Sequence, residues 1–453
     1  MISKRYAKAN NDYVISEQVN VAQPRSFIQY LDMNNLYGSC MVKPLPVSDF
    51  KFWTEDELRK GLDVTKIPSD SETGYILEVD LEYPPELHDV HNDYPLAPER
   101  LTVTDDMLSD YALSFPDRPR PTEKLIPNLM NKTRYVVHYE NLKLYIRLGM
   151  KLMHIHRVLQ FKQTAWLKPY VDRCTSMRKL AQSDFEKDFW KLSVNAVFGK
   201  SMENLRNRVN VRLLSESLPA IKMAAKPTFV TSRIINEDLV MMQQLKGTLT
   251  MNRPIYTGFC ILELSKAMMY DFHYNVMMKQ YGHDRLELLF TDTDSLTYKI
   301  TTDDLFRDMG SNIDAYDTSN FDVDHPLYSK KNAKVLGKMK SETGSRCPSE
   351  FVGLRAKMYS LLLSHKEHPK ITAKGIKKTF AAKHVTHAQF KNTLETKTRT
   401  FANFRNFRSC NHVIETLDIK KICLAAYDDK RYLKDDGVTS WAYGHKDIPG
   451  PVR

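Results

Sequence analysis

The stretch Leu289-Phe290-Thr291-Asp292-Thr293-Asp294-Ser295-Leu296-Thr297-Tyr298 places two carboxylates one residue apart between two short apolar runs. Apolar residues alternate with period two on both sides of it, so the pattern predicts a β-hairpin with Asp292 and Asp294 at its turn. Carboxylates on a rigid hairpin suit Mg²⁺, a hard cation that takes oxygen ligands and keeps positions open for substrate phosphates. Asp and Ser are also common turn formers, so the same residues are compatible with a plain turn. The rest of the chain decides between these two interpretations.

Composition narrows the class of protein. The chain has 453 residues, enough for a large core and about three domains. With 66 basic and 55 acidic residues its formal charge is +11, which favours a polyanionic partner. Its six cysteines show no Cys-x-x-Cys spacing, so neither a zinc site nor a disulfide framework is expected. Free cysteines are typical of a protein in a reducing compartment. No apolar run approaches the roughly 18 residues that span a bilayer, and no signal peptide is evident. We therefore expect a soluble, intracellular protein without a membrane partner.

A second carboxylate follows a buried strand near the beginning of the chain. Residues 1–24 are polar and are interpreted as a leader, and the first regular element is a strand over 26–32 that gives way to a helical pattern over 33–41. A carboxylate at the end of a buried strand is costly without a charged partner, so Asp32 is a candidate metal ligand. The alternative is that Asp32 and Asn34 cap the helix that follows.

A basic helical segment covers residues 166–204. Lys187, Lys191 and Asn195 are spaced four residues apart, so they project from one face of a helix. This row either binds an anion or is a solvated face.

The remaining segments carry weaker signals. Prolines cluster over 44–161, which predicts an inserted, loop-rich module with a strand over 74–83 and a strand pair over 151–161. The acidic row Glu78, Asp80 and Glu82 is interpreted as a solvated face rather than a second metal site. Strands are expected at Val209 to Leu213 and Thr228 to Ile235, and an amphipathic helix from Phe390 to Phe407.

Several separated segments together resemble the polymerase core of family B DNA polymerases. Motif A of that family is matched by Asp32 with Leu36-Tyr37, motif B by Lys191 to Gly199, motif C by Asp292-Thr293-Asp294, and the Lys-x-Tyr motif by Lys357-Met358-Tyr359. The order and spacing are similar to those of the protein-primed branch found in bacteriophages, adenoviruses, linear plasmids and Maverick/Polinton transposons. The phrase Asp428-Asp429-Lys430-Arg431-Tyr432 looks most like the transposon group.

The resemblance implies a role for each matching residue. Phosphoryl transfer needs charge neutralised at the attacking and the leaving oxygen, which two Mg²⁺ ions do, with Mn²⁺ as a substitute. Asp32 and Asp294 would be the catalytic metal ligands, and Asp292 a supporting catalytic residue. The implied nucleotide-binding residues are Tyr37, Arg178, Lys179, Lys191, Asn195 and Phe198, with Tyr37 lying under the incoming sugar and excluding a 2′-hydroxyl. The implied DNA-binding residues are Lys357, Tyr359 and Lys374, on a basic surface that includes 334–340.

The resemblance also implies an α+β, right-hand fold with a palm of antiparallel sheet and helices, fingers formed by a helical hairpin, and a thumb. The expected layout is a leader (1–24), a first palm segment (25–43), a first insertion of the kind that contacts a terminal protein (44–161), fingers (162–203), a second insertion-like segment (204–250), a second palm segment (251–360) and thumb (361–453). An ordinary connecting hairpin over 204–250 is the alternative. The expected partners are primer-template DNA, dNTPs and, if priming uses a protein, a terminal protein. The expected location is the nucleus or a replication site of a virus or mobile element rather than an organelle.

Departures from the family pattern set further expectations. Motif B has Ala196 where Ser is usual and Phe198 where Tyr is usual, which removes a hydroxyl and keeps the ring that stacks. Few residues precede motif A, where the family carries a 3′ to 5′ exonuclease domain, so the chain is expected not to proofread. Two rival classes are another palm polymerase, such as an RNA-dependent one, and a non-catalytic, truncated DNA-binding remnant of a mobile-element polymerase. Adjacent aspartates in motif C would favour the first, and loss of the three carboxylates would favour the second.

Overall fold

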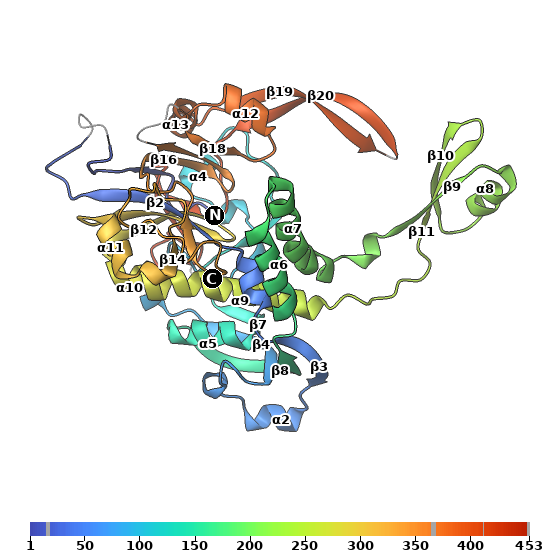
Figure 1. The fold of residues 1–453 in the computed structure, drawn as a ribbon, viewed down its shortest axis with the longest axis horizontal. Helices are drawn as coiled ribbons and strands as arrows, with labels where there is room; N and C mark the ends of the chain where they lie inside the picture. Colours follow the sequence, from blue (N-terminus) through green and yellow to red (C-terminus); the bar gives the residue numbers. More distant parts are fainter. Residues whose placement is uncertain (15–18, 364–367, 411, 451–453) are drawn as a thin grey trace.

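A five-stranded sheet lies at the centre of the molecule (Figure 1). The computed structural model describes residues 1–14, 19–363, 368–410 and 412–450. The strand order is β12-β13-β2-β15-β14, and all neighbours are antiparallel except β14 and β15. The strands are β2 (Ser26–Met33), β12 (Leu286–Asp292), β13 (Ser295–Thr301), β14 (Tyr316–Asp317) and β15 (Met339–Ser341). The predicted hairpin is confirmed, and the expected all-antiparallel sheet has one parallel edge.

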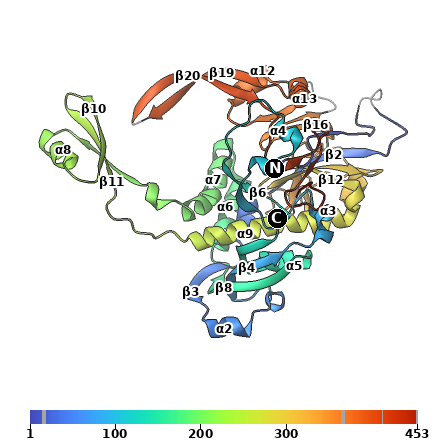
Figure 2. The ribbon, with the colours of Figure 1, turned by 180° about the vertical axis from the view of Figure 1, so that it is seen from behind.

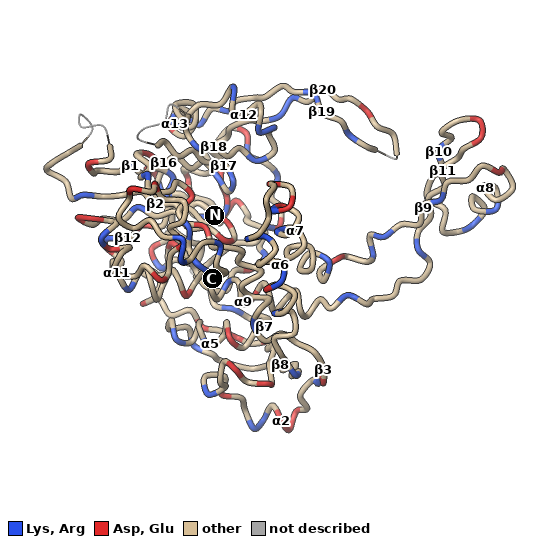
Figure 3. Tube along the Cα trace, in the orientation of Figure 1, with Lys and Arg blue, Asp and Glu red and all other residues tan. Residues whose placement is uncertain are grey.

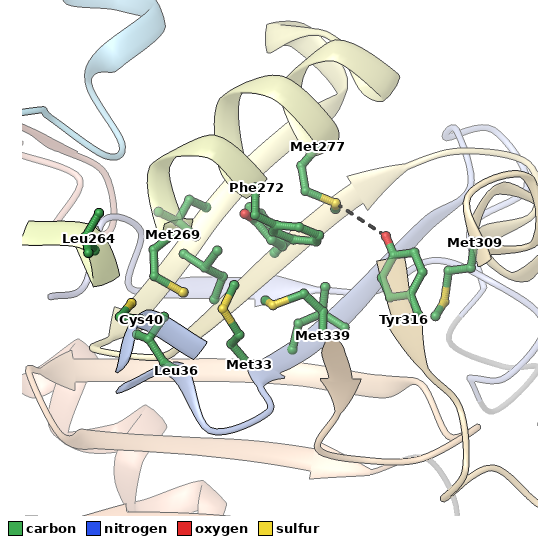
Figure 4. Close-up of a cluster of buried hydrophobic side chains, with 14 of the residues drawn as sticks. Met33, Leu36, Cys40, Leu264, Met269, Phe272, Met277, Met309, Tyr316 and Met339 are labelled. Atoms are coloured by element: carbon green, nitrogen blue, oxygen red, sulfur yellow. Dashed lines mark hydrogen bonds between the residues drawn. The ribbon is translucent and has the colours of Figure 1, made fainter. Parts of the chain in front are cut away.

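One face of this sheet is packed under a long helix. Helix α9 (Ile255–Asp271) continues through a π-helical segment (Phe272–Met278) into α10 (Lys279–Tyr281). Its buried side chains meet those of β2, α1 (Leu36–Met41) and β15, as Figure 4 shows for a methionine-rich part of the core. The hydroxyl of Tyr316 donates to the sulfur of Met277 over 3.7 Å within this cluster. Methionine adapts to irregular gaps, which suits a core formed by segments from four parts of the chain.

A second sheet shows that the beginning of the chain is not a simple leader. Its order is β1-β16-β17-β18, from β1 (Tyr6–Lys8), β16 (Pro348–Arg355), β17 (Met358–Leu363) and β18 (Lys370–Ala373). Arg5 is fully buried and donates to backbone carbonyls, including that of Leu354 at 3.1 Å. The interpretation of 1–24 as a polar leader is therefore wrong, because several of its side chains have their partners far away in the sequence.

Residues 44–161 contribute a second four-stranded sheet to the molecule. The order is β3-β8-β4-β7, from β3 (Leu45–Phe52), β4 (Thr73–Glu82), β7 (Lys132–His138) and β8 (Lys151–Thr164). Helix α5 (Tyr139–Arg147) lies between this sheet and α9 (Figure 2). The expected strand pair over 151–161 is wrong, since one long strand runs through it. Glu78 and Glu82 form ion pairs with Arg and Lys side chains of β7 and β8, and Asp80 lies 2.8 Å from a ring nitrogen of His156. These contacts fit the interpretation of the acidic row as a surface face. The module's remaining elements are α2 (Glu55–Lys60), α3 (His88–His91), β5 (Glu99–Thr102), α4 (Asp110–Leu113) and β6 (Glu123–Ile126).

The basic segment forms two helices, α6 (Lys168–Leu180) and α7 (Asp184–Ser201). Ser183 separates the two helices, because it is the N-cap of α7 and forms a capping box with Glu186. The Ser183 side chain accepts from the backbone N–H of Glu186, and the Glu186 side chain accepts from the backbone N–H of Ser183. The two helices stand beside α1 and α9, and α7 then leads out of the body.

Residues 204–250 project away from the body (Figures 1 and 2). They form a three-stranded sheet of order β10-β11-β9, from β9 (Val209–Leu214), β10 (Phe229–Asn236) and β11 (Leu239–Leu245), with α8 (Ser217–Ala224) packed on it. This is more than a connecting hairpin, so that alternative is wrong.

The C-terminal part begins with α12 (Lys378–His384) and α13 (His387–Thr396) and continues into a long hairpin, β19 (Thr400–Cys410) and β20 (Val413–Leu424). The expected helix from Phe390 to Phe407 is therefore wrong in its second half. The chain then returns to the body, where β21 (Tyr432–Leu433) pairs with β22 (Ser440–Trp441). Arg431 is buried there and donates to the backbone carbonyl of Asn92 at 2.8 Å, so 361–453 does not form one separate unit. None of the helices described could cross a membrane.

Candidate active site

Asp32 and Asp294 lie on neighbouring strands at the same end of the central sheet. Ser295, the residue after Asp294, pairs with Asp32 in the register of β13 and β2. The backbone N–H of Met33 donates to the carbonyl of Asp294 over 2.7 Å, which fixes the hairpin turn beside the end of β2. Because neighbouring strands are about 4.8 Å apart, the two carboxylates share one site. The structure thus brings together the two residues that the motifs name as metal ligands.

The capping alternative for Asp32 is wrong. The N-cap of α1 is Asn35, whose side-chain oxygen accepts from the backbone N–H of Gly38 at 3.2 Å. Asn34 instead donates its side-chain amide to Asp317 at 2.7 Å. Within the part of the chain that the structure describes, the Asp32 side chain forms no hydrogen bond with α1.

The electrostatics of the pair suit a divalent cation. Burial and the neighbouring charge of Asp294 raise the pKa of Asp32 to about 7. Burial, followed by the charge of Asp292, also raises the pKa of Asp294. Two half-buried carboxylates that repel each other are stabilised in their ionised form by a cation between them. Their oxygen ligands are of the kind that Mg²⁺ prefers, so the residues present fit the expected metal.

Asp292 is arranged differently from Asp294. The turn bends through Thr293, which has a φ of 61°, and so directs the two aspartates to different partners. Asp292 forms an ion pair with Lys357 at 3.2 Å, so the first aspartate of motif C is joined to the lysine of the Lys-x-Tyr motif. Asp292 thus already has a cationic partner, and its supporting catalytic role stays a prediction.

Glu342 is a carboxylate at this site that the sequence motifs do not contain. It follows β15, its backbone N–H donates to the carbonyl of Tyr30 over 2.9 Å, and its charge acts on both Asp32 and Asp294. Its side chain forms an ion pair with Lys370 at 2.5 Å. The phrase Lys340-Ser341-Glu342 has no distinctive periodicity, and only its pairing beside β2 reveals it.

Helix α7 brings Lys191 to the carboxylates. Its ammonium charge lowers the pKa values of both Asp32 and Asp294, although burial dominates each shift. Arg178, on α6, and Lys191 line one narrow pocket together with Asn35. Asn195 lies one turn further along α7, half-buried, and Lys179 is exposed at the end of α6. The helical row predicted from the four-residue spacing therefore faces the site at Lys191.

Tyr37 and Phe198 meet as a stacked pair. Their ring centroids are 4.5 Å apart with an interplanar angle of 23°, which joins motif A on α1 to motif B on α7. Both rings are half-buried at the edge of the core. Flat aromatic surfaces next to carboxylates and cations provide what a nucleotide needs, namely a stacking face and charges for its phosphates.

The three expected DNA-binding residues are not equivalent. Lys357 and Lys374 are exposed and adjacent, because the backbone N–H of Lys374 donates to the carbonyl of Lys357 over 3.0 Å. Tyr359 is only 4% exposed, and its hydroxyl shares a hydrogen bond with that of Tyr30 over 3.1 Å. Tyr359 therefore packs against β2 through Tyr30, and its contact with DNA stays a prediction.

Another cluster of possible metal ligands comes from elements that carry none of these residues. Among the described residues, Asp89, His445 and Asp447 are the group of three whose ligand atoms lie close enough to hold an ion. Asp89 already forms an ion pair with Lys446, so the cluster has its own cation. It is not the site that the motifs predicted.

Comparison with known proteins identifies the family. A model of the DNA polymerases of type B, organellar and viral, matches residues 19–277, more than half of the chain, from before Asp32 to past motif B. The chain belongs to the type B DNA polymerases. This confirms the resemblance to the family B DNA polymerases that the sequence motifs indicated.

Solved structures show the same fold for this type B polymerase. Phi29 DNA polymerase in a ternary complex with primer-template DNA and incoming nucleotide substrates is similar with a TM-score of 0.52 and 14% identity. The similarity covers 93% of this chain and 61% of that one. An orthorhombic crystal form of the same enzyme gives a TM-score of 0.50 at 14% identity, covering 93% of this chain and 62% of that one. No curated protein matches the sequence. This type B polymerase therefore spans about three fifths of the length of these relatives.

Proposed function

We propose that the chain catalyses template-directed DNA synthesis, transferring deoxynucleotidyl groups from dNTPs to the 3′ end of a primer. The observation that supports this most is the convergence of Asp32, Asp294 and Lys191 from three separate segments within one site. Belonging to the type B polymerases makes DNA synthesis the expected chemistry. The phi29 ternary complex contains primer-template DNA and incoming nucleotide substrates, which supports the same partners for this chain.

In this proposal each of the site residues has a separate role. Asp32 and Asp294 would hold Mg²⁺, which when bound would supply positive charge for the phosphoryl-transfer chemistry. Lys191 and Arg178 bind the triphosphate by their positive charge, with Lys179 and Asn195 further along the same helices. Tyr37 and Phe198 present ring faces to the sugar and the nascent base pair. Asp292 holds Lys357 beside the turn, where its exposed ammonium, with Lys374, meets phosphates of the primer-template duplex.

We assign the parts of the polymerase on the same grounds. The central sheet with α9 is the palm, α6 and α7 are the fingers, and α12, α13 and the hairpin β19–β20 form the thumb. Figure 3 shows Lys and Arg along the hairpin, which suits contact with a phosphate backbone. The tip of the hairpin reaches the projecting segment, since His412 and Gln243 share a hydrogen bond of 2.7 Å between their side chains. We propose that 204–250 and the hairpin lie on either side of the DNA, and that 44–161 is the module that a terminal protein contacts.

Primer extension tests the function directly. The purified protein should extend a primed template with dNTPs and Mg²⁺ or Mn²⁺, and Asp294→Asn should abolish extension because one metal ligand loses its charge. Asp303→Asn is the matched control, since Asp303 is exposed on the loop after β13 and has no ion pair among the described residues. Absence of extension by the wild-type chain with either metal would favour the non-catalytic alternative. The expectation that the chain does not proofread stays a prediction.

A further inference from the structure

A loop of the palm faces the two finger helices across a narrow pocket. Lys334, in the loop before β15, lines this pocket from one side, and Arg178 and Lys191 line it from the other. The remaining wall comes from Asn34 and Asn35, which follow Asp32. The pocket thus joins the catalytic strand β2 to the cations of α6 and α7.

Four neighbouring cations act on Lys334. Burial, followed by the charges of Arg178, Lys187, Lys340 and Lys179, lowers the pKa of Lys334. Among the described residues, Lys334, Arg178 and Lys191 have no carboxylate within ion-pair distance. Lys187 and Lys340 do have carboxylate partners, Asp184 at 3.0 Å and Asp317 at 4.0 Å. The other cations repel one another, and a polyanion placed among them relieves that repulsion. This position therefore favours the binding of a group with several negative charges.

Asp317 fixes the loop that carries Lys334. Its carboxylate is almost fully buried, and one oxygen accepts both the side-chain amide of Asn34 at 2.7 Å and the backbone N–H of Lys334 at 2.9 Å. The other oxygen accepts the backbone N–H of Ser319 at 3.0 Å. Lys334 has a φ of 57°, a left-handed conformation that a non-glycine residue adopts only when its surroundings hold it.

A further set of backbone contacts ties this loop to motif A. Asn34 N–H donates to the carbonyl of Lys338 over 2.9 Å, and Gly337 N–H donates to the carbonyl of Asn34 over 3.0 Å. The loop is consequently attached two residues from Asp32. These contacts hold the backbone of the loop beside motif A.

We propose that Lys334 binds the triphosphate of the incoming nucleotide from the palm side, opposite Arg178 and Lys191, and that Asp317 is the positioning residue that directs it. The inference rests on the proposed polymerase function and adds a cation that none of the four motifs contains. It also revises the expected place of Lys334 on the surface that contacts the primer-template duplex.

The test compares Lys334→Ala with Lys331→Ala. Lys331 lies three residues away, is exposed and pairs with Asp314 at 2.9 Å, so it is a control for charge alone. Lys334→Ala should raise KM for dNTPs about tenfold, the loss expected of one charge-assisted hydrogen bond. It should weaken inhibition by inorganic tripolyphosphate by a similar factor, change kcat less than KM, and leave the Kd for primer-template DNA unchanged. A raised Kd for the duplex with an unchanged KM would overturn the proposal.

Asp317→Asn tests the positioning role. It keeps the volume of the side chain but replaces one acceptor oxygen by a donor, so it should raise KM as Lys334→Ala does. If Asp317 acts through Lys334, the double variant should be no worse in KM than Lys334→Ala. Effects that multiply, or a fall in kcat with no change in KM, would assign Asp317 a structural role only.

Nucleotide binding separates this proposal from the proposed function. In the Asp294→Asn background, the Kd for dNTP on a primer-template complex can be measured without turnover. Lys334→Ala should still raise that Kd, and Lys331→Ala should not. An inactive wild-type enzyme whose nucleotide binding depends on Lys334 would contradict the function and support the inference, and equal Kd values for all variants would overturn the inference.

Discussion

Glu342 acts on the same two aspartates that the motifs identify, from the position directly after β15. Its charge adds to the repulsion at Asp32 and Asp294, and its side chain forms an ion pair with Lys370. Carboxylates that repel one another increase the affinity of their site for a divalent cation, because the cation relieves the repulsion.

Replacing Glu342 by Gln removes that charge at constant volume. We expect the Mg²⁺ concentration for half-maximal extension to rise several-fold, with a smaller change in rate at saturating Mg²⁺. Activity measured over a range of Mg²⁺ concentrations tests this, with Glu395→Gln, which is exposed on α13, as the control. The same half-saturation for Glu342→Gln and the wild type would show that Glu342 does not act on the metal site.

At this scale the sequence predicted the residues that motifs name and missed those that only tertiary structure brings in. Asp32, Asp294 and Lys191 are recognisable because their motifs have fixed spacing. Glu342 and Lys334 lie in a segment without periodicity, and their function depends on β15 pairing beside β2. Such pairing joins residues about 300 positions apart, which no local pattern encodes.

Among the elements, α1 shows how closely local geometry controls the site. The helix has six residues, and its N-cap, Asn35, has a φ of 46°. Asn tolerates this left-handed conformation better than most residues, and its side chain also accepts the N–H of Gly38. Tyr37 follows two residues later, so the cap determines where its ring stacks on Phe198.

Two substitutions separate these contributions of Asn35. Asn35→Gly keeps the backbone conformation and loses the cap, and Asn35→Ala loses both. The free energy of unfolding should fall in the order wild type, Gly, Ala, with the Ala variant destabilised by about 1–2 kcal/mol. Thermal or urea unfolding measures this, and an Ala variant as stable as the Gly variant would show that the left-handed backbone carries no cost.

Element boundaries were predicted less well than element types. The helix expected from Phe390 to Phe407 ends at Thr396 because Lys397 has a φ of 58°, and the chain then enters β19. Helices often end in that conformation at a glycine, but here a lysine adopts it, so the sequence offers no visible stop signal. The hairpin at 286–301, by contrast, was predictable because alternation on both sides of a turn leaves little choice of register.

For the whole molecule, acid stability should depend on three buried histidines that lie where separate modules meet. Burial lowers the pKa of His91 to about 4 and those of His138 and His273 to about 3, from an ordinary value of 6.5. The unfolded chain binds these protons at a higher pH than the folded chain, so their contribution to stability is complete above pH 6.5 and is lost as the pH falls towards 3 to 4. Each group adds up to about 1.4 kcal/mol per pH unit to that loss.

Urea unfolding at pH values between 7 and 4.5 measures this dependence. His273→Phe should reduce the slope of stability against pH by about one proton. The ring is retained in its stack on Tyr298, so any loss of stability at pH 7 reports the hydrogen bond of 3.1 Å between the two side chains. A slope that is unchanged by the substitution would mean that His273 does not control acid unfolding.

The contact between His412 and Gln243 has a topological consequence. The projecting segment and the hairpin are each anchored in the body (Figures 1 and 2). The hydrogen bond between His412, directly before β20, and Gln243 of β11 joins them into a continuous loop of protein. A linear strand can be threaded through such a loop by a free end, whereas a covalently closed circle enters only when the loop opens. If DNA runs between the two projections, the shape of the template molecule, and not only its sequence, decides how the enzyme is loaded.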